Sequence, residues 1–90
     1  MHETGIVRNI IRRLEAAAKD AGAVRVSGLD VRLGALSPFS PAHFVEHFDD
    51  EARGTIAEGA KLRIHLSDDT ADPHAQDVMM ESIDFELPEA

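Results

Sequence analysis

The chain has 90 residues, of which 43% are apolar and 29% charged, and a formal net charge of −8 at pH 7. This size and composition predict one small globular domain with a modest core and exclude a disordered chain. The acidity and the 4% aromatic content argue against a nucleic-acid partner, and the lack of cysteine excludes disulfides, thiolate zinc sites and cysteine nucleophiles.

The N-terminal part of the chain predicts a helix followed by a strand. Apolar residues recur every three or four positions over residues 5–21, which is typical of an amphipathic helix. Thr4 is a candidate N-cap for this helix, and Gly22 is a candidate stop. Residues 23–33 alternate between apolar and polar side chains, and the alternation slips at Gly28, which predicts a strand with a bulge.

The remainder of the chain predicts one helix and two strands. Ser40 and the proline that follows it are typical of a helix start, so we expect a helix over residues 41–52. Within residues 56–66 apolar residues alternate after Gly59, which predicts a second strand, and a third strand is predicted near residues 78–87. The alternation of the last predicted strand also slips in parity, near Glu81-Ser82.

The order of these elements predicts a single α+β domain over residues 1–90, with the topology αβαββ. The helix between the first two strands is long enough for a right-handed parallel crossover. The polar connection 67–77 has no helical pattern, which favours antiparallel pairing of the second and third strands. We therefore expect a three-stranded mixed sheet with two helices packed on one face. The open edges of so small a sheet would allow a homodimer.

The sequence also argues against a membrane protein and against an enzyme. No apolar run is long enough to span a bilayer, and residues 1–20 are charged and amphipathic, unlike a signal peptide. We therefore expect a cytoplasmic protein with no membrane partner. No phosphate-binding glycine loop or serine nucleophile elbow is present, so no catalytic activity is predicted.

The first five residues, Met1-His2-Glu3-Thr4-Gly5, are the leading candidate for metal binding. The α-amine of Met1, the deprotonated amide nitrogen of His2 and its imidazole are covalently adjacent and can surround one ion in a plane. Ni²⁺ and Cu²⁺ accept planar nitrogen ligands, whereas Zn²⁺ and Mg²⁺ do not seek them. A bulky second residue generally hinders removal of Met1, which favours a retained amine. The alternative is that His2 is an ordinary terminal residue.

The other histidines are weaker candidates. His43 and His47 are four residues apart on the second predicted helix, which is a ligand spacing, but two ligands do not define a site. A solvated polar face is the simpler interpretation, unless this helix lies beside the N-terminus. His65 is predicted to point outward from a strand. His74 lies in the acidic connection, where a flexible linker is the simpler interpretation and a site for a hard cation or for adventitious nickel is the alternative.

Four sequence blocks, in this order, resemble one known family. They are Met1-His2-Glu3, Gly34-Ala35-Leu36-Ser37 after the first strand, a second helix that bears proline and phenylalanine, and Gly54-Thr55-Ile56-Ala57-Glu58-Gly59-Ala60 before the second strand. Together they look like the HypA/HybF family, the nickel metallochaperones of NiFe-hydrogenase maturation. The match covers residues 1 to about 66, and residues 78–87 resemble the last strand of that family.

The resemblance implies a nickel-binding α/β lobe with Met1, His2 and Glu3 at the metal site. It implies delivery of Ni(II) to the hydrogenase large subunit together with the GTPase HypB and, in some organisms, service to urease. Family members often carry a carboxylate at the position that matches Ser40. Serine is a poorer ligand, and here it has the position of a helix cap.

The chain departs from the family between its second and third strands. A typical member carries a zinc lobe there, with two paired-cysteine motifs, whereas this chain has only the connection Ser67–Asp77. No zinc is therefore expected. The loss leaves an alternative function, that of a degenerate member which no longer traffics metal. Such a protein would act as an interaction or assembly module that docks on a maturation partner.

Overall fold

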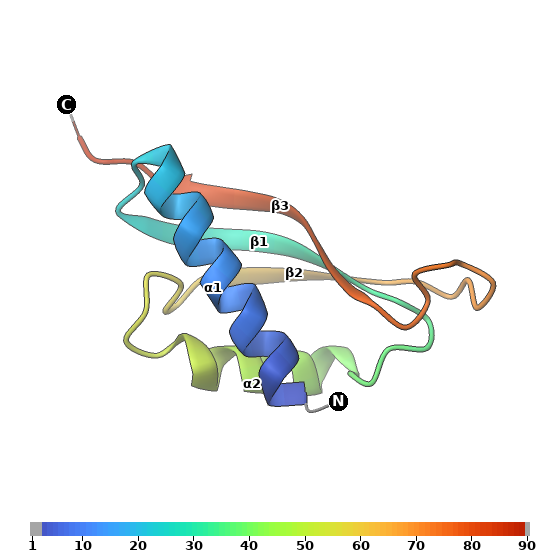
Figure 1. Cartoon of the computed structure of the whole chain (residues 1–90). Coiled ribbons are helices and arrows are strands. Elements are labelled where there is room, and N and C mark those ends of the chain that lie inside the picture. Colours follow the sequence, from blue (N-terminus) through green and yellow to red (C-terminus); the bar gives the residue numbers. More distant parts are fainter. Residues whose placement is uncertain (1–2, 90) are drawn as a thin grey trace.

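The computed structural model describes residues 3–89, which form two helices and three strands (Figure 1). The predicted order αβαββ and the α+β class are confirmed. Within the described range, neither helix combines the length and the apolar content needed to cross a bilayer. In chain order the elements are α1 (Glu3–Ala21), β1 (Arg25–Leu33), α2 (Pro41–Ala52), β2 (Lys61–Leu66) and β3 (Val78–Glu86).

Two of the three predicted helix-end signals are confirmed. Ser40 caps α2, where its Oγ accepts a hydrogen bond from the backbone N–H of His43 at 3.2 Å. Gly22 follows α1 in the left-handed conformation, with φ of 67°, which glycine adopts without strain. Thr4 was expected to cap α1, but it lies inside the first turn because the helix already includes Glu3.

The sheet has the strand order β2-β1-β3, with β1 at its centre (Figure 1). β1 pairs with β2 in parallel, as predicted, and with β3 in antiparallel orientation. The expectation that β2 and β3 pair with each other is wrong. β1 is the strand with the largest number of buried residues, whereas β2 and β3 are only partly buried. The central position of β1 therefore places its apolar side chains under the helices.

The connection 67–77 passes around the end of β1, which allows β3 to reach the far edge. The Ser67 N–H donates to the Leu33 carbonyl at 2.9 Å, and the Gly34 N–H donates to the Asp77 carbonyl at 2.9 Å. A Cβ atom on Gly34 would lie 2.2 Å from the carbonyl oxygen of Ala75. Glycine is therefore required where the connection crosses the end of β1.

The predicted bulge near Gly28 is confirmed in the pairing of β1 with β3, and the parity slip near Glu81 coincides with a second shift of register. The first leaves Ser27, beside Gly28, outside the register, and the second leaves Glu81 outside it. Each extra residue restores the alternation after a parity slip, so the apolar side chains stay on one face.

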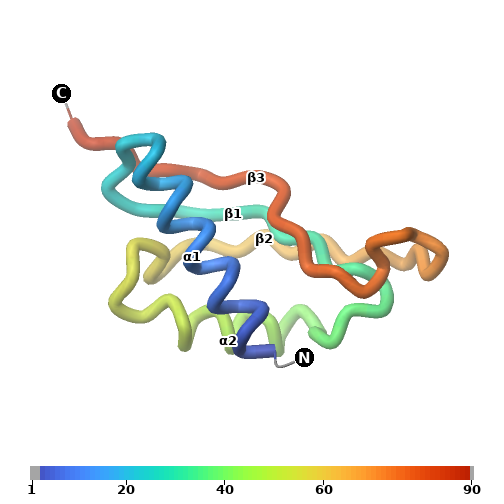
Figure 2. Tube along the Cα trace, in the orientation of Figure 1, coloured from blue at the N-terminus to red at the C-terminus, as the bar shows by residue number. Residues whose placement is uncertain are grey.

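Both helices cover the same face of the sheet, as predicted (Figures 1 and 2). α1 contacts β1 and β3, α2 contacts β2, and the two helices contact each other. Their packing brings the N-terminal end of α1 beside the N-terminal half of α2. The buried core consists of Val7, Ile10, Ile11, Leu14, Ala18, Val26, Leu29, Val31, Leu33, Phe39, Phe44, Phe48, Ala52, Ala57 and Ala60.

The other face of the sheet carries a polar network centred on Asp30. The Arg63 guanidinium donates two hydrogen bonds to the Asp30 carboxylate, at 2.9 and 3.1 Å. His65 lies 2.9 Å from the same carboxylate, and Ser82 also donates to it. The hydrogen bonds from Arg63, then Ser82, then His65 hold the pKa of Asp30 well below its ordinary value. Arg63 also pairs with Asp84 at 2.8 Å.

Replacing Asp30 by asparagine is expected to destabilise the protein near neutral pH. It should also make the free energy of unfolding depend less on pH in the acid range. A carboxyl whose pKa is lower in the folded state stabilises the fold above its unfolded pKa of about 3.9, and that contribution is lost as the pH falls below this value. The gap in unfolding free energy between wild type and Asp30→Asn should therefore narrow between neutral pH and about pH 2. Urea titrations over this pH range measure it.

Arg63→Gln supplies the matched control for the Asp30 network. Since Arg63 is the main partner, Asp30→Asn should cost less in an Arg63→Gln background than in wild type. Two results together would contradict this description of the network. They are additive effects of the two substitutions on stability, and a difference in unfolding free energy between wild type and Asp30→Asn that does not depend on pH.

Candidate functional site

One of the three predicted metal ligands lies within the described residues. Met1 and His2 lie outside the described range, so the proposed terminal nitrogen ligands stay predictions. Glu3 is the first residue of α1, where an acidic side chain is favourable to the helix dipole. Its side chain is 33% exposed, which leaves the carboxylate accessible to an ion from solvent.

The two histidines of α2 face each other one helical turn apart. The spacing of four residues places His43 and His47 on the same side of α2, and their Nε2 atoms are 2.8 Å apart. Their ring centroids lie 4.5 Å apart. Ser40 fixes the start of this turn through its hydrogen bond to the His43 N–H. The histidine pair is therefore attached to a well-defined helix end.

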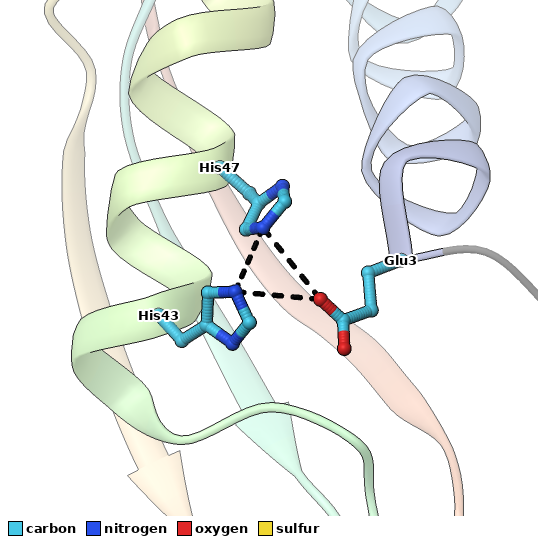
Figure 3. A group of neighbouring side chains, drawn as sticks. All are labelled: Glu3, His43 and His47. Atoms are coloured by element: carbon cyan, nitrogen blue, oxygen red, sulfur yellow. Dashed lines mark hydrogen bonds and ion pairs between the residues drawn. The ribbon is translucent and has the colours of Figure 1, made fainter.

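The carboxylate of Glu3 reaches this pair from the neighbouring helix (Figure 3). One of its oxygens lies 3.4 Å from Nε2 of His43 and 3.6 Å from Nε2 of His47. The three side chains, which we call the Glu3 cluster, therefore turn one oxygen and two nitrogens toward a common point (Figure 3). The side chains of His43 and His47 are 43% and 30% exposed, so the cluster lies open at the surface.

The Glu3 cluster is supported from beneath by the core. Phe39 is buried and packs edge-on against both imidazoles, with centroid distances of 5.8 Å to His43 and 6.0 Å to His47. Phe39 also packs edge-on against Phe44, at 5.3 Å. Such aromatic contacts restrict the orientations open to the imidazoles. The rings are therefore held in place on the side away from solvent.

An ion pair also joins the two helices that carry the cluster. Arg8, on α1, donates to the carboxylate of Glu51, on α2. Because α1 supplies Glu3 and α2 supplies both histidines, this contact helps to keep the helices in the packing that brings the three groups together. It also gives Glu51, one of the acidic residues near the C-terminal end of α2, a cationic partner.

The remaining predicted candidates do not join the Glu3 cluster. His65 lies on the open face of the sheet, where it contacts Asp30. His74 lies in the connection between β2 and β3 and contacts Asp77 at 2.9 Å. Ser40 acts as a helix cap, as expected.

The sequence pointed to parts of the cluster but not to its assembly. The spacing of His43 and His47 is a ligand spacing, but the sequence alone makes a solvated polar face the simpler interpretation. The condition under which the pair would matter, a second helix beside the N-terminus, is met by the packing of α1 on α2. The signal that was available is the amphipathic pattern of both helices, which requires them to share the small apolar face of one sheet.

Comparison with known proteins identifies relatives of this chain. Residues 1–75 match the family model described as hydrogenase/urease nickel incorporation, metallochaperone, hypA. The hydrogenase maturation factor HypA of Acidithiobacillus ferrooxidans is 34% identical over 64 residues, which cover 71% of this chain and 57% of that protein. HypA of Chlorobium limicola is 38% identical over 64 residues, with coverages of 71% and 55%. HypA of Escherichia coli is 35% identical over 72 residues, with coverages of 80% and 60%.

The fold is similar to that of a solved structure. The solution structure of the Ni metallochaperone HypA from Helicobacter pylori aligns with a TM-score of 0.80 at 17% identity, covering 98% of this chain and 100% of that chain. This likeness supports the fold, and the sequence matches support the family. The chain spans less than two thirds of the length of the curated relatives named above. It belongs to the HypA family of hydrogenase and urease nickel-incorporation proteins.

Proposed function

We propose that this protein binds Ni²⁺ and delivers it during maturation of NiFe-hydrogenase, with urease as a second class of client. The observation that carries this proposal is the family match over residues 1–75, which contains the predicted terminal ligands and the whole Glu3 cluster. Its role is then to hold and transfer an ion as cargo, with no chemical step to catalyse. The net charge of −8 favours the approach of a cation.

The proposed nickel site consists of Met1, His2 and Glu3. Ni²⁺ would be bound by the Met1 amine and by the amide and imidazole nitrogens of His2, with the Glu3 side chain as a further ligand or as a hydrogen-bond acceptor that orients the imidazole. The position of Glu3 at the start of α1, with its carboxylate accessible, supports this arrangement. Because the nitrogens bind the ion only when deprotonated, protonation or exchange with a partner's ligands would release it.

We further propose that the chain represents the nickel lobe of the family without its zinc lobe, as one domain over residues 1–90. Two observations support this. The connection Ser67–Asp77 follows β2 directly and leads into β3, and the 90-residue sequence contains no cysteine. Thiolate zinc ligands are therefore not available in this sequence, and we expect Ni²⁺ but no structural zinc.

The proposed partners follow from the proposed delivery. They are a HypB-type GTPase and the hydrogenase large subunit, encountered in the cytoplasm. A strongly acidic surface with few aromatic side chains makes nucleic acid an unsuitable partner. β2 and β3 form the two edges of the sheet, and either edge would serve for a homodimer or for docking.

A transfer experiment tests the proposed delivery. Protein loaded with one equivalent of Ni²⁺ is mixed with a nickel-free precursor of the hydrogenase large subunit, a HypB-type GTPase and a competing chelator. We expect the precursor to gain nickel faster than it does from the nickel–chelator complex alone. Equal rates would contradict delivery. In that case, the protein would be the docking module instead if it still captured the precursor in the presence of excess chelator and if the His2→Ala variant captured it too.

A further inference from the structure

We propose that the side chains of Glu3, His43 and His47 form a binding site for a divalent transition-metal ion that does not need the Met1 amine. The inference deepens the proposed function, because Glu3 would then lie between a terminal nitrogen site and a second position built on α2. It rests on the geometry of the Glu3 cluster alone, and its test is chosen so that either proposal can fail while the other stands.

The separations within the Glu3 cluster suit one shared ion. The two Nε2 atoms are 2.8 Å apart, and the Glu3 oxygen is 3.4 and 3.6 Å from them. A circle through three points with these separations has a radius of about 1.9 Å, close to the distances of about 2.0–2.2 Å at which first-row ions lie from imidazole nitrogen and carboxylate oxygen. An ion slightly above the plane of the three atoms would meet all three with little movement of the side chains.

The alternative role of the cluster is a local hydrogen-bond and ion-pair contact. That role engages fewer of the lone pairs on these three side chains than a bound ion would. A hydrogen bond between the Nε2 atoms of His43 and His47 needs a proton on one of them and engages the lone pair of the other. An ion at the centre would engage the lone pairs of both neutral imidazoles and an oxygen of Glu3. Two imidazoles and one carboxylate form a set that Zn²⁺, Ni²⁺ and Cu²⁺ all accept.

The number of ligands suits temporary binding. Three protein ligands leave at least one coordination position for water or for an incoming ligand, whereas sites that hold a metal permanently usually close with four. The partial exposure of all three side chains keeps this position open to solvent and to a partner. The site would therefore exchange its ion readily, as a cargo protein requires.

The surrounding structure holds the ligands in place before the ion arrives. Phe39 contacts both imidazoles, Ser40 fixes the turn that carries His43, and the pair of Arg8 with Glu51 joins the helices. Ligands held in this way lose less conformational freedom on binding than mobile surface side chains do. The Glu3 cluster therefore differs from a chance group of surface residues.

The test uses the full chain with its Met1 amine acetylated, which removes that ligand and leaves the Glu3 cluster intact. Zn²⁺ and Ni²⁺ are titrated separately by calorimetry, and imidazole NMR signals are followed with Zn²⁺. We expect one equimolar site, with ion-dependent shifts confined to His43 and His47. His43→Ala and His47→Ala should each weaken binding by at least about 100-fold, because even groups that only orient a ligand account for about 10–100-fold. Glu3→Gln should weaken it less.

His65→Ala and His74→Ala are matched controls, since each removes a histidine outside the cluster. Both should bind the ions as the acetylated wild type does, and thermal unfolding would establish that all variants are folded. Equal affinity in wild type and His47→Ala, or no equimolar site in the acetylated protein, would overturn the inference and leave a local ion-pair contact only. Neither result bears on the terminal site, which is tested with the free amine.

Discussion

Replacing His2 by alanine is expected to abolish the tight, equimolar Ni²⁺ site of protein that starts with a free Met1 amine. The substitution removes the imidazole and opens one of the fused chelate rings, so only the amine and amide nitrogens of the planar nitrogen set remain to hold the ion. We expect the affinity to fall by at least about 100-fold, which corresponds to about 3 kcal/mol. Calorimetric titration and the visible absorption of planar, nitrogen-bound Ni²⁺ would both report the loss.

His74→Ala is the matched control for this substitution, because it also removes one histidine but lies in the connection between β2 and β3. It should leave the tight site unchanged. Equal nickel affinity in wild type and His2→Ala, measured on protein with an unblocked start, would contradict the proposed terminal site. Weaker binding that persists in His2→Ala and disappears on further substitution of His47 would belong to the Glu3 cluster.

Phe44→Ala is expected to produce the largest loss of stability among single core substitutions. Phe44 is fully buried on α2, packs edge-on against Phe39 and lies 6.1 Å from the ring of Phe48. Truncating a buried phenylalanine costs about 3–5 kcal/mol, a large share of the roughly 5–15 kcal/mol that stabilises a small domain. Urea unfolding followed by circular dichroism would measure the change.

The same substitution should also weaken the Glu3 cluster, since α2 carries both of its histidines and Phe39 packs between Phe44 and the imidazoles. Phe44→Leu is the control: it keeps most of the apolar volume and should cost no more than about 1.5 kcal/mol. If Phe44→Ala lowered the free energy of unfolding by less than about 1 kcal/mol, which is roughly one tenth of a small domain's stability, α2 would not be anchored as described.

The local elements could be predicted from sequence because their signals are local. The helix start at Ser40 and the stop at Gly22 each depend on a few neighbouring residues. The parity slips at Gly28 and Glu81 are visible in the alternation of apolar residues, and each corresponds to a bulge. Residue type and spacing were sufficient for these features.

The strand order could not be predicted from these signals. A connection without a helix suggested that β2 and β3 are neighbours, but β1 lies between them. The deciding factor is long-range: the apolar β1 is buried best at the centre, and the connection is anchored to its end through Gly34 and Asp77. Neither factor appears in the local pattern of residues 67–77.

The Glu3 cluster likewise cannot be predicted from sequence, although each of its three members is a candidate residue by itself. Sequence spacing relates His43 to His47, but it does not relate either histidine to Glu3, which lies on another helix. That contact depends on how α1 and α2 share one face of the sheet. The terminal ligands, by contrast, were predicted from covalent adjacency, and Met1 and His2 lie outside the described residues.

Nickel titration before and after selective acetylation of the Met1 amine tests the terminal nickel site most directly. With the free amine, we predict one tight site in calorimetry, together with the absorption of planar, nitrogen-bound Ni²⁺. After acetylation, we predict that this tight site and its absorption are lost and that only the weaker binding of the Glu3 cluster remains. Tight binding of unchanged affinity in the acetylated protein would contradict a nickel site built on the start of the chain.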